Sequence, residues 1–202
     1  MTNLEIRIQH AYLLDPYFQE IFDCRQEKQL IDKGLVYNSR ESILQKIAEY
    51  EAAWYDRKQV LQFMQEVLKL DFYKSVIDVY IVGAMRGAIS TPVLIGSNVS
   101  VENFPDILIH ELLHNLISDN KQKIDVIKIL ATLFPDETRL TKNHVLIYAM
   151  MTKIYTEFLQ NPTKLEDIKK RDQNFPDYVK AWEIVKAEGS AAIIEKFKSF
   201  YC

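Results

Sequence analysis

The stretch ILIHELLHNL, residues 107–116, places two of the chain's four histidines inside an otherwise apolar segment. His110 and His114 stand four residues apart, and Glu111 directly follows the first histidine. Apolar residues occupy nearly every other side of the segment, which is typical of a helix buried within a protein. We therefore predict a buried helix over residues 103–120 that carries three polar side chains for a specific purpose.

The spacing of the two histidines predicts a metal site. Residues i and i+4 share one face of a helix, so the imidazoles of His110 and His114 can bind one ion. Glu111 lies about 100° further round the helix, where its carboxylate can border the position of a metal-activated water and accept its proton. The alternative is a pair of core histidines hydrogen-bonded to backbone carbonyls. A metal ion would satisfy both buried rings, so we favour the metal site.

The motif HELLH at residues 110–114 resembles the zincin metallopeptidases. The resemblance extends over residues 76–159, where a pair of strands and a capped loop precede the motif helix. It implies a Zn²⁺ ion, hydrolysis of peptide bonds, and a strand beside the helix that holds an extended substrate. The longer metzincin motif, which adds a glycine and a third histidine close behind, is absent.

A catalytic zinc ion usually has three protein ligands, so a third must come from another segment. The candidates are His144, Glu157 and Glu137, and we favour His144. Glu157 belongs to the same predicted helix as His144, but thirteen residues correspond to about 220° of rotation, so only one of the two is expected to face the metal. Glu137 fits better as an acidic residue in the first turn of that helix.

Peptide hydrolysis also requires a group that stabilises the oxyanion. We predict Tyr148 for this role because it shares a helix face with His144, and Tyr155 and His10 are alternatives. Asp106, one turn before the motif, can accept a hydrogen bond from a ligand imidazole or simply favour the helix N-terminus. Arg86 can meet a substrate carboxylate or be a solvated charge in a turn.

The patterning of the whole chain predicts an α+β fold in a single domain over residues 1–202, mostly helical with a small sheet before the motif helix. Residues 1–74 form an N-terminal helical part, 75–160 the sheet and metal-site core, and 161–202 a helical tail. We expect strands at 4–9, 76–82 and 88–95, and helices at 15–31, 39–70, 123–134, 136–160, 176–187 and 190–200. The expected inner residues of the long helix at 39–70 are Ile43, Ile47, Tyr50, Trp54, Val60, Leu61, Met64 and Leu68.

Composition excludes several classes of protein. The formal net charge is −3, from 25 basic and 28 acidic residues, and no segment concentrates lysine and arginine as nucleic-acid binding requires. We expect no secretory signal and no membrane span, which needs about 20 apolar residues. Two cysteines, Cys24 and Cys202, make neither a disulfide framework nor a metal cluster, although they can pair with each other. A cytoplasmic setting follows as an expectation.

The sequence thus predicts a zinc-dependent metallopeptidase that acts on a peptide or protein substrate, with Glu111 as general base. The strand expected at 88–95 would align the substrate by backbone pairing. An alternative is a zincin-like domain that binds zinc but serves a binding or scaffolding role. A helical domain with a coincidental motif is the third interpretation, and it predicts no metal.

Overall fold

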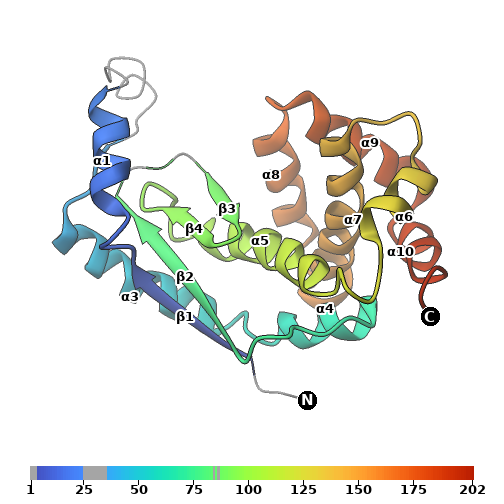
Figure 1. The fold of residues 1–202 in the computed structure, drawn as a ribbon, viewed down its shortest axis with the longest axis horizontal. Coiled ribbons are helices and arrows are strands. Elements are labelled where there is room, and N and C mark those ends of the chain that lie inside the picture. Colours follow the sequence, from blue (N-terminus) through green and yellow to red (C-terminus); the bar gives the residue numbers. More distant parts are fainter. Residues whose placement is uncertain (1–3, 25–35, 84, 86) are drawn as a thin grey trace. The chain divides into compact units, whose positions relative to one another are not determined.

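The computed structural model describes residues 4–24, 36–83, 85 and 87–202, and these residues form an α+β fold (Figure 1). The predicted fold class is therefore confirmed. The elements are β1 (Glu5–His10), α1 (Asp15–Cys24), α3 (Arg40–Tyr55), α4 (Val60–Leu68), β2 (Val76–Val82), β3 (Ala88–Ser90), β4 (Val93–Gly96), α5 (Phe104–Asp119), α6 (Val126–Leu133), α7 (Arg139–Lys153), the π-helical segment η1 (Ile154–Phe158), α8 (Pro162–Asp172), α9 (Pro176–Glu188) and α10 (Ser190–Lys198).

The chain forms two compact units. The first contains residues 1–58 and 74–115, and the second contains residues 59–73 and 116–202. Helix α5 contributes to both, because the division falls between Asn115 and Leu116. The expectation of a single domain over residues 1–202 stays a prediction.

The first unit is built on a four-stranded sheet in the order β1-β2-β4-β3. Strands β1, β2 and β4 are parallel, while β3 pairs antiparallel with β4 at the edge. Strand β2 alternates in burial, with Ile77, Val79 and Ile81 directed into the core. Helix α3, which lies between β1 and β2 in the sequence, packs against both strands and covers one face of this part of the sheet (Figure 1).

The prediction of a single strand at residues 88–95 is wrong. The structure has a hairpin instead, in which Thr91 and Pro92 form the turn between β3 and β4. Proline has no N–H to donate to a ladder, so it is suited to the turn and not to the middle of a strand. The consequence is a short edge strand, β3, with β4 buried between it and β2.

The long helical pattern at 39–70 forms two helices. Ser39 caps α3, since its hydroxyl accepts a hydrogen bond from the Ser42 N–H at 3.3 Å. Residues 56–59 separate α3 from α4, so the single helix expected over these residues is interrupted. All eight predicted inner residues are buried, which confirms the period of the apolar positions: Ile43, Ile47, Tyr50, Trp54, Val60, Leu61, Met64 and Leu68.

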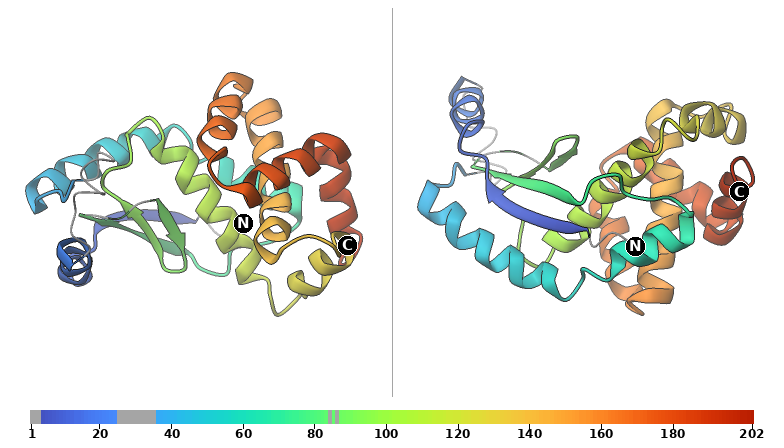
Figure 2. Two further views of the ribbon diagram at one scale, coloured as in Figure 1. Left: turned by 90° about the horizontal axis from the view of Figure 1, so that it is seen from above. Right: turned by 60° about the horizontal axis from the view of Figure 1, so that its bottom comes forward.

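The second unit consists of helices. Helix α7 packs against α9 and α10, and these three lie together in both views of Figure 2. Their core includes the rings of Tyr148 and Trp182, which stack with centroids 4.0 Å apart. The helix predicted at 136–160 begins at Arg139 and changes to π-helical hydrogen bonding from Ile154 onward.

Two further expectations concern the N-terminal helix and membranes. Helix α1 covers Asp15–Cys24, and the remainder of the helix expected at 15–31 lies outside the described residues. None of the described helices combines the length and apolar character that crossing a bilayer requires.

Candidate metal centre

Helix α5 begins where the sequence predicts. The carbonyl of Asn103 accepts the Ile107 N–H at 3.1 Å, the first such bond of the helix, and Pro105 occupies its first turn. Five apolar side chains anchor the helix with no exposed surface, and they are Leu108, Ile109, Leu112, Leu113 and Leu116. Their packing leaves His110 and His114 half-buried on the remaining face.

The two motif histidines face each other at a distance suited to one metal ion. Their Nε2 atoms are 3.2 Å apart, and their ring planes are inclined by 63°. Two nitrogens bonded at 2.0–2.1 Å to one tetrahedral zinc ion would lie about 3.3 Å apart. The i, i+4 spacing therefore brings the pair close to the separation that shared coordination requires.

Glu111 is buried, with only 8% of its surface exposed. Burial raises the pKa of its carboxyl group to about 7, while a hydrogen bond with the Ser90 side chain acts in the opposite direction. A carboxylate whose pKa lies near neutral pH is well matched to accepting a proton from water.

Asn115, one turn after Glu111, connects α5 to the edge strand. Its Nδ2 donates to the Ser90 carbonyl at 2.6 Å and to the Glu111 carbonyl at 3.0 Å. The Gly96 N–H donates to the Gly87 carbonyl at 3.2 Å, so Gly87 and Gly96 form a hydrogen-bonded pair. Hydrogen-bonded and non-hydrogen-bonded pairs alternate along an antiparallel ladder, so the N–H and C=O groups of Ala88 and Ser90 point away from β4. Asn115 thus donates a hydrogen bond to one of the carbonyl groups of β3 that point away from β4, and this bond holds the strand beside Glu111.

His144 lies in α7, whose N-terminus is capped by Thr138. The Nδ1–H group of His144 donates a hydrogen bond to the Leu140 carbonyl at 2.8 Å, and in this tautomer Nε2 carries the lone pair. Burial lowers the pKa of His144, and the Leu140 carbonyl, Asp172 and Asp177 oppose this effect. A neutral imidazole with a defined tautomer is the form that binds a metal.

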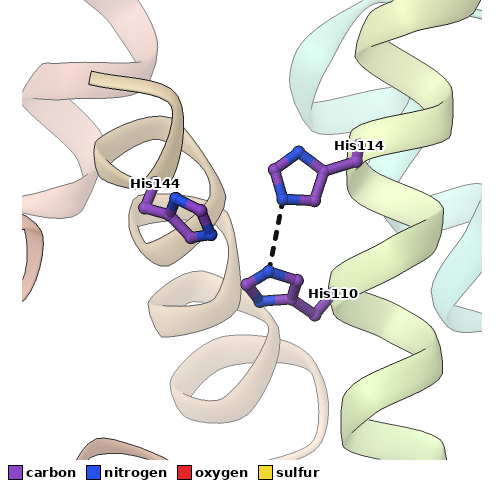
Figure 3. Close-up of side chains that lie close together, drawn as sticks. All are labelled: His110, His114 and His144. Atoms are coloured by element: carbon purple, nitrogen blue, oxygen red, sulfur yellow. Dashed lines mark hydrogen bonds between the residues drawn. The ribbon is translucent and has the colours of Figure 1, made fainter. Parts of the chain in front are cut away.

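His110, His114 and His144 each offer a donor nitrogen, and these three atoms lie within 4.8 Å of one another (Figure 3). The rings come from α5 and α7 and point toward one another. Three neutral imidazoles suit zinc and several other transition metals. The donor set of three imidazoles is therefore chemically fit to hold a metal ion.

The two glutamates considered as third ligands do not belong to this group. Glu157 lies in η1, is half-exposed, and pairs with Lys153 at 2.7 Å. Glu137 lies just before α7 and pairs with Lys180 at 3.7 Å. Each carboxylate therefore has a cationic partner.

Tyr148, the predicted oxyanion partner, is completely buried. Burial raises its pKa far above the usual range, and the charge of Asp172 and a hydrogen bond with that carboxylate add to the effect. The ring centroids of Tyr148 and His144 are 5.5 Å apart. The ring of Tyr148 thus lies beside that of His144, and its hydroxyl group is buried within the protein.

The remaining candidates are dispersed. Tyr155 is buried in η1, and Asp106 is buried in the first turn of α5, where its charge favours the helix N-terminus. His10, at the end of β1, pairs with the Asp15 carboxylate, which also accepts the Gly83 N–H. Arg86 lies outside the described residues.

Sequence reasoning missed Ser90, Asn115 and Tyr178. Asn115 carried a signal, because a single amide in an apolar helix needs a partner when buried. Ser90 and Tyr178 carried none, since a serine in a strand and one of eleven tyrosines are ordinary residues. Their relevance comes from contacts with Glu111 and His144.

No family model, curated protein or solved structure matches the chain.

Proposed function

We propose that the protein is a zinc-dependent, zincin-like metallopeptidase. The observation that carries the proposal is the arrangement in α5, where the Nε2 atoms of His110 and His114 are 3.2 Å apart and a buried Glu111 lies between them in sequence. His144 is the proposed third ligand, since its nitrogen belongs to the same group of donors. A purely structural zinc ion would have no need of the buried carboxylate.

Zinc bound by the three histidines would supply Lewis acidity, which lowers the pKa of water toward about 7. The carboxylate of Glu111 accepts a proton from the water that attacks the peptide carbonyl. It then returns the proton to the amine nitrogen as the C–N bond breaks. Ser90 donates a hydrogen bond that holds the carboxylate in place.

The peptide substrate is proposed to lie along the outer edge of β3. This strand is last in the sheet order, and the peptide groups of Ala88 face away from β4. An extended peptide can add to such an edge by backbone hydrogen bonds. Tyr148 is the proposed oxyanion partner, and Tyr148→Phe tests this role.

The experiment compares the full-length wild type with Glu111→Gln, His144→Ala and Glu157→Gln. Bound zinc is measured by elemental mass spectrometry, and cleavage of a mixed peptide library by mass spectrometry. We expect zinc and cleavage in the wild type. Glu111→Gln should keep zinc and lose about 10²-fold or more in cleavage, the scale of a general base. Glu157→Gln, the matched carboxylate outside the site, should change neither.

Four results would contradict the proposal in different ways. A zinc-free wild type excludes the metal site, and equal cleavage by wild type and Glu111→Gln excludes the mechanism. If His144→Ala keeps full zinc affinity and Glu157→Gln loses zinc affinity, the third ligand is Glu157 and not His144. Zinc binding without cleavage of any peptide would indicate the binding or scaffolding role.

A further inference from the structure

The ring of His144 is covered by an aromatic side chain from another helix. Tyr178, in the first turn of α9, lies with its ring centroid 4.2 Å from that of His144, and the two planes are inclined by 33°. Tyr178 is half-buried, and its ring centroid lies 5.2 Å from that of Phe175. The imidazole of His144 is therefore in contact with a side chain of α9 as well as with the backbone of its own helix, α7.

The neighbouring residue of α9 fixes the start of the helix that carries His144. The Asp177 carboxylate accepts hydrogen bonds from the hydroxyls of Thr138 and Thr141, the second at 2.8 Å. Thr138 is the N-cap of α7, and Thr141 is fully buried in its first turn. Two adjacent side chains of α9 thus act on consecutive turns of α7.

These contacts restrict the imidazole in three independent ways. The Leu140 carbonyl, 2.8 Å from Nδ1, selects the tautomer and one ring rotation. The Tyr178 ring limits the rotation that remains, and Asp177 prevents the first turn of α7 from fraying. A ligand held before the metal arrives loses less conformational freedom on binding, which increases affinity.

We propose that the first turn of α9 is a positioning element for His144, so that zinc affinity depends on the docking of α9 against α7. The inference rests on the proposed role of His144 as a zinc ligand. Tyr178 and Asp177 are positioning residues, because neither is expected to touch the metal or the substrate. By linkage, zinc should strengthen the docking of α9, and any change that loosens α9 should weaken zinc binding.

The test measures zinc affinity of the full chain by competition with a chelating dye. The variants are Tyr178→Ala, Tyr178→Phe, Asp177→Ala and His144→Ala. We expect Tyr178→Ala and Asp177→Ala to weaken zinc binding about tenfold, the scale observed for groups that orient metal ligands. Tyr178→Phe keeps the ring and should rescue the affinity.

Tyr201→Ala is the matched control for the loss of a tyrosine. Tyr201 is also half-buried and lies in the same unit, but it contacts Phe197 and the Leu68 carbonyl. Asp167→Ala is the control for Asp177, because this half-exposed carboxylate pairs only weakly with Lys170 at 3.6 Å. Both controls should leave zinc affinity unchanged.

A second measurement uses metal-free protein. The ring protons of His144, observed by NMR, should lose the ring-current shift from Tyr178 in Tyr178→Ala and keep it in Tyr178→Phe. Exchange of the backbone amide protons of Asp177 and Tyr178 should slow when zinc is added to the wild type. Neither readout depends on peptide cleavage.

The failure of this inference differs from failure of the proposed function. If His144→Ala weakens zinc binding while Tyr178→Ala and Asp177→Ala behave like their controls, the positioning role is overturned and the ligand assignment stands. If His144→Ala binds zinc as the wild type does, the ligand assignment fails and the inference fails with it.

Discussion

The side-chain amide of Asn115 is expected to clamp the edge strand to α5, and its replacement offers a direct measurement of that contact. Asn115 is 7% exposed, and its Nδ2 donates to the Ser90 carbonyl at 2.6 Å and to the Glu111 carbonyl at 3.0 Å. Asn115→Ala removes both bonds and leaves the Ser90 carbonyl without this donor. Of these two bonds, the one to the Ser90 carbonyl joins α5 to β3, whereas the other lies within α5 itself.

The expected loss follows from these contacts. One buried hydrogen bond contributes about 1 kcal/mol net, and an acceptor left without its donor raises the loss to about 2 kcal/mol for Asn115→Ala. Asn115→Asp should cost more at neutral pH, because a buried carboxylate would face two carbonyl oxygens. We expect about 3 kcal/mol or more at pH 8.

The stability of Asn115→Asp should decrease, relative to the wild type, as pH rises. The folded site disfavours the charged form, so the pKa of the new carboxyl group should rise above its unfolded value of about 3.9. The protonated group's contribution to stability is then fully present below the unfolded pKa and is lost as pH rises through the folded pKa. The loss amounts to about 1.4 kcal/mol for each pH unit that separates the folded pKa from the unfolded pKa. Protonated aspartic acid can still donate one hydrogen bond to Ser90.

The assay is urea unfolding of zinc-free protein, followed by circular dichroism at pH 4 to 8, with each variant compared with the wild type at the same pH. Zinc is removed by a chelator so that the metal site does not contribute. Two outcomes refute the reasoning. One is an Asn115→Ala variant within about 0.5 kcal/mol of the wild type, the range of ordinary surface changes. The other is a pH-independent difference between Asn115→Asp and the wild type.

Three further predictions address the fold and the metal. Gly96→Ala should cost about 3 kcal/mol or more, because its Cβ would lie 2.0 Å from the Met85 carbonyl oxygen, whereas Gly87→Ala, with φ +83° and nothing within 4 Å, should cost about 1 kcal/mol in urea unfolding. Tyr50→Phe should cost about 1 kcal/mol by losing the bond to the Val99 carbonyl at 2.6 Å. Burial raises the pKa of Tyr50 to about 12, so the stability difference between wild type and Tyr50→Phe should shrink as pH rises from 10 toward 12. Zinc affinity, measured by dye competition, should fall below about pH 6.5 because each histidine ligand must be neutral; constant affinity down to pH 5 would argue against a histidine site.

The motif helix shows how much local sequence can determine. Its i, i+4 histidines, apolar remainder and N-terminal proline are properties of consecutive residues, and helical geometry alone relates them. The same holds for the inner residues of α3 and α4, whose period follows from 3.6 residues per turn. These predictions needed no knowledge of distant contacts.

Local sequence patterns could not predict the edge strand β3. Residues 88–95 are rich in β-branched residues, and this composition fits either one strand or a hairpin with Thr91 and Pro92 in the turn. Pairing with β2 decided the matter, because β4 lies between β2 and β3 in the sheet. That pairing is a property of segments far apart in the chain.

The choice among ligands also depended on long-range contacts. The count of 100° per residue between His144 and Glu157 fails beyond Ile154, where π-helical bonds change the rotation, and Lys153 pairs with Glu157. The sequence by itself determined the helix, its two histidines and the carboxylate between them, since these follow from the periodicity of one segment. Only the tertiary structure decided that Ser90 contacts both that carboxylate and Asn115, and that Tyr178 and Asp177 lie against the start of α7 and the ring of His144. Those contacts join residues that lie far apart in the chain, and no local pattern encodes them.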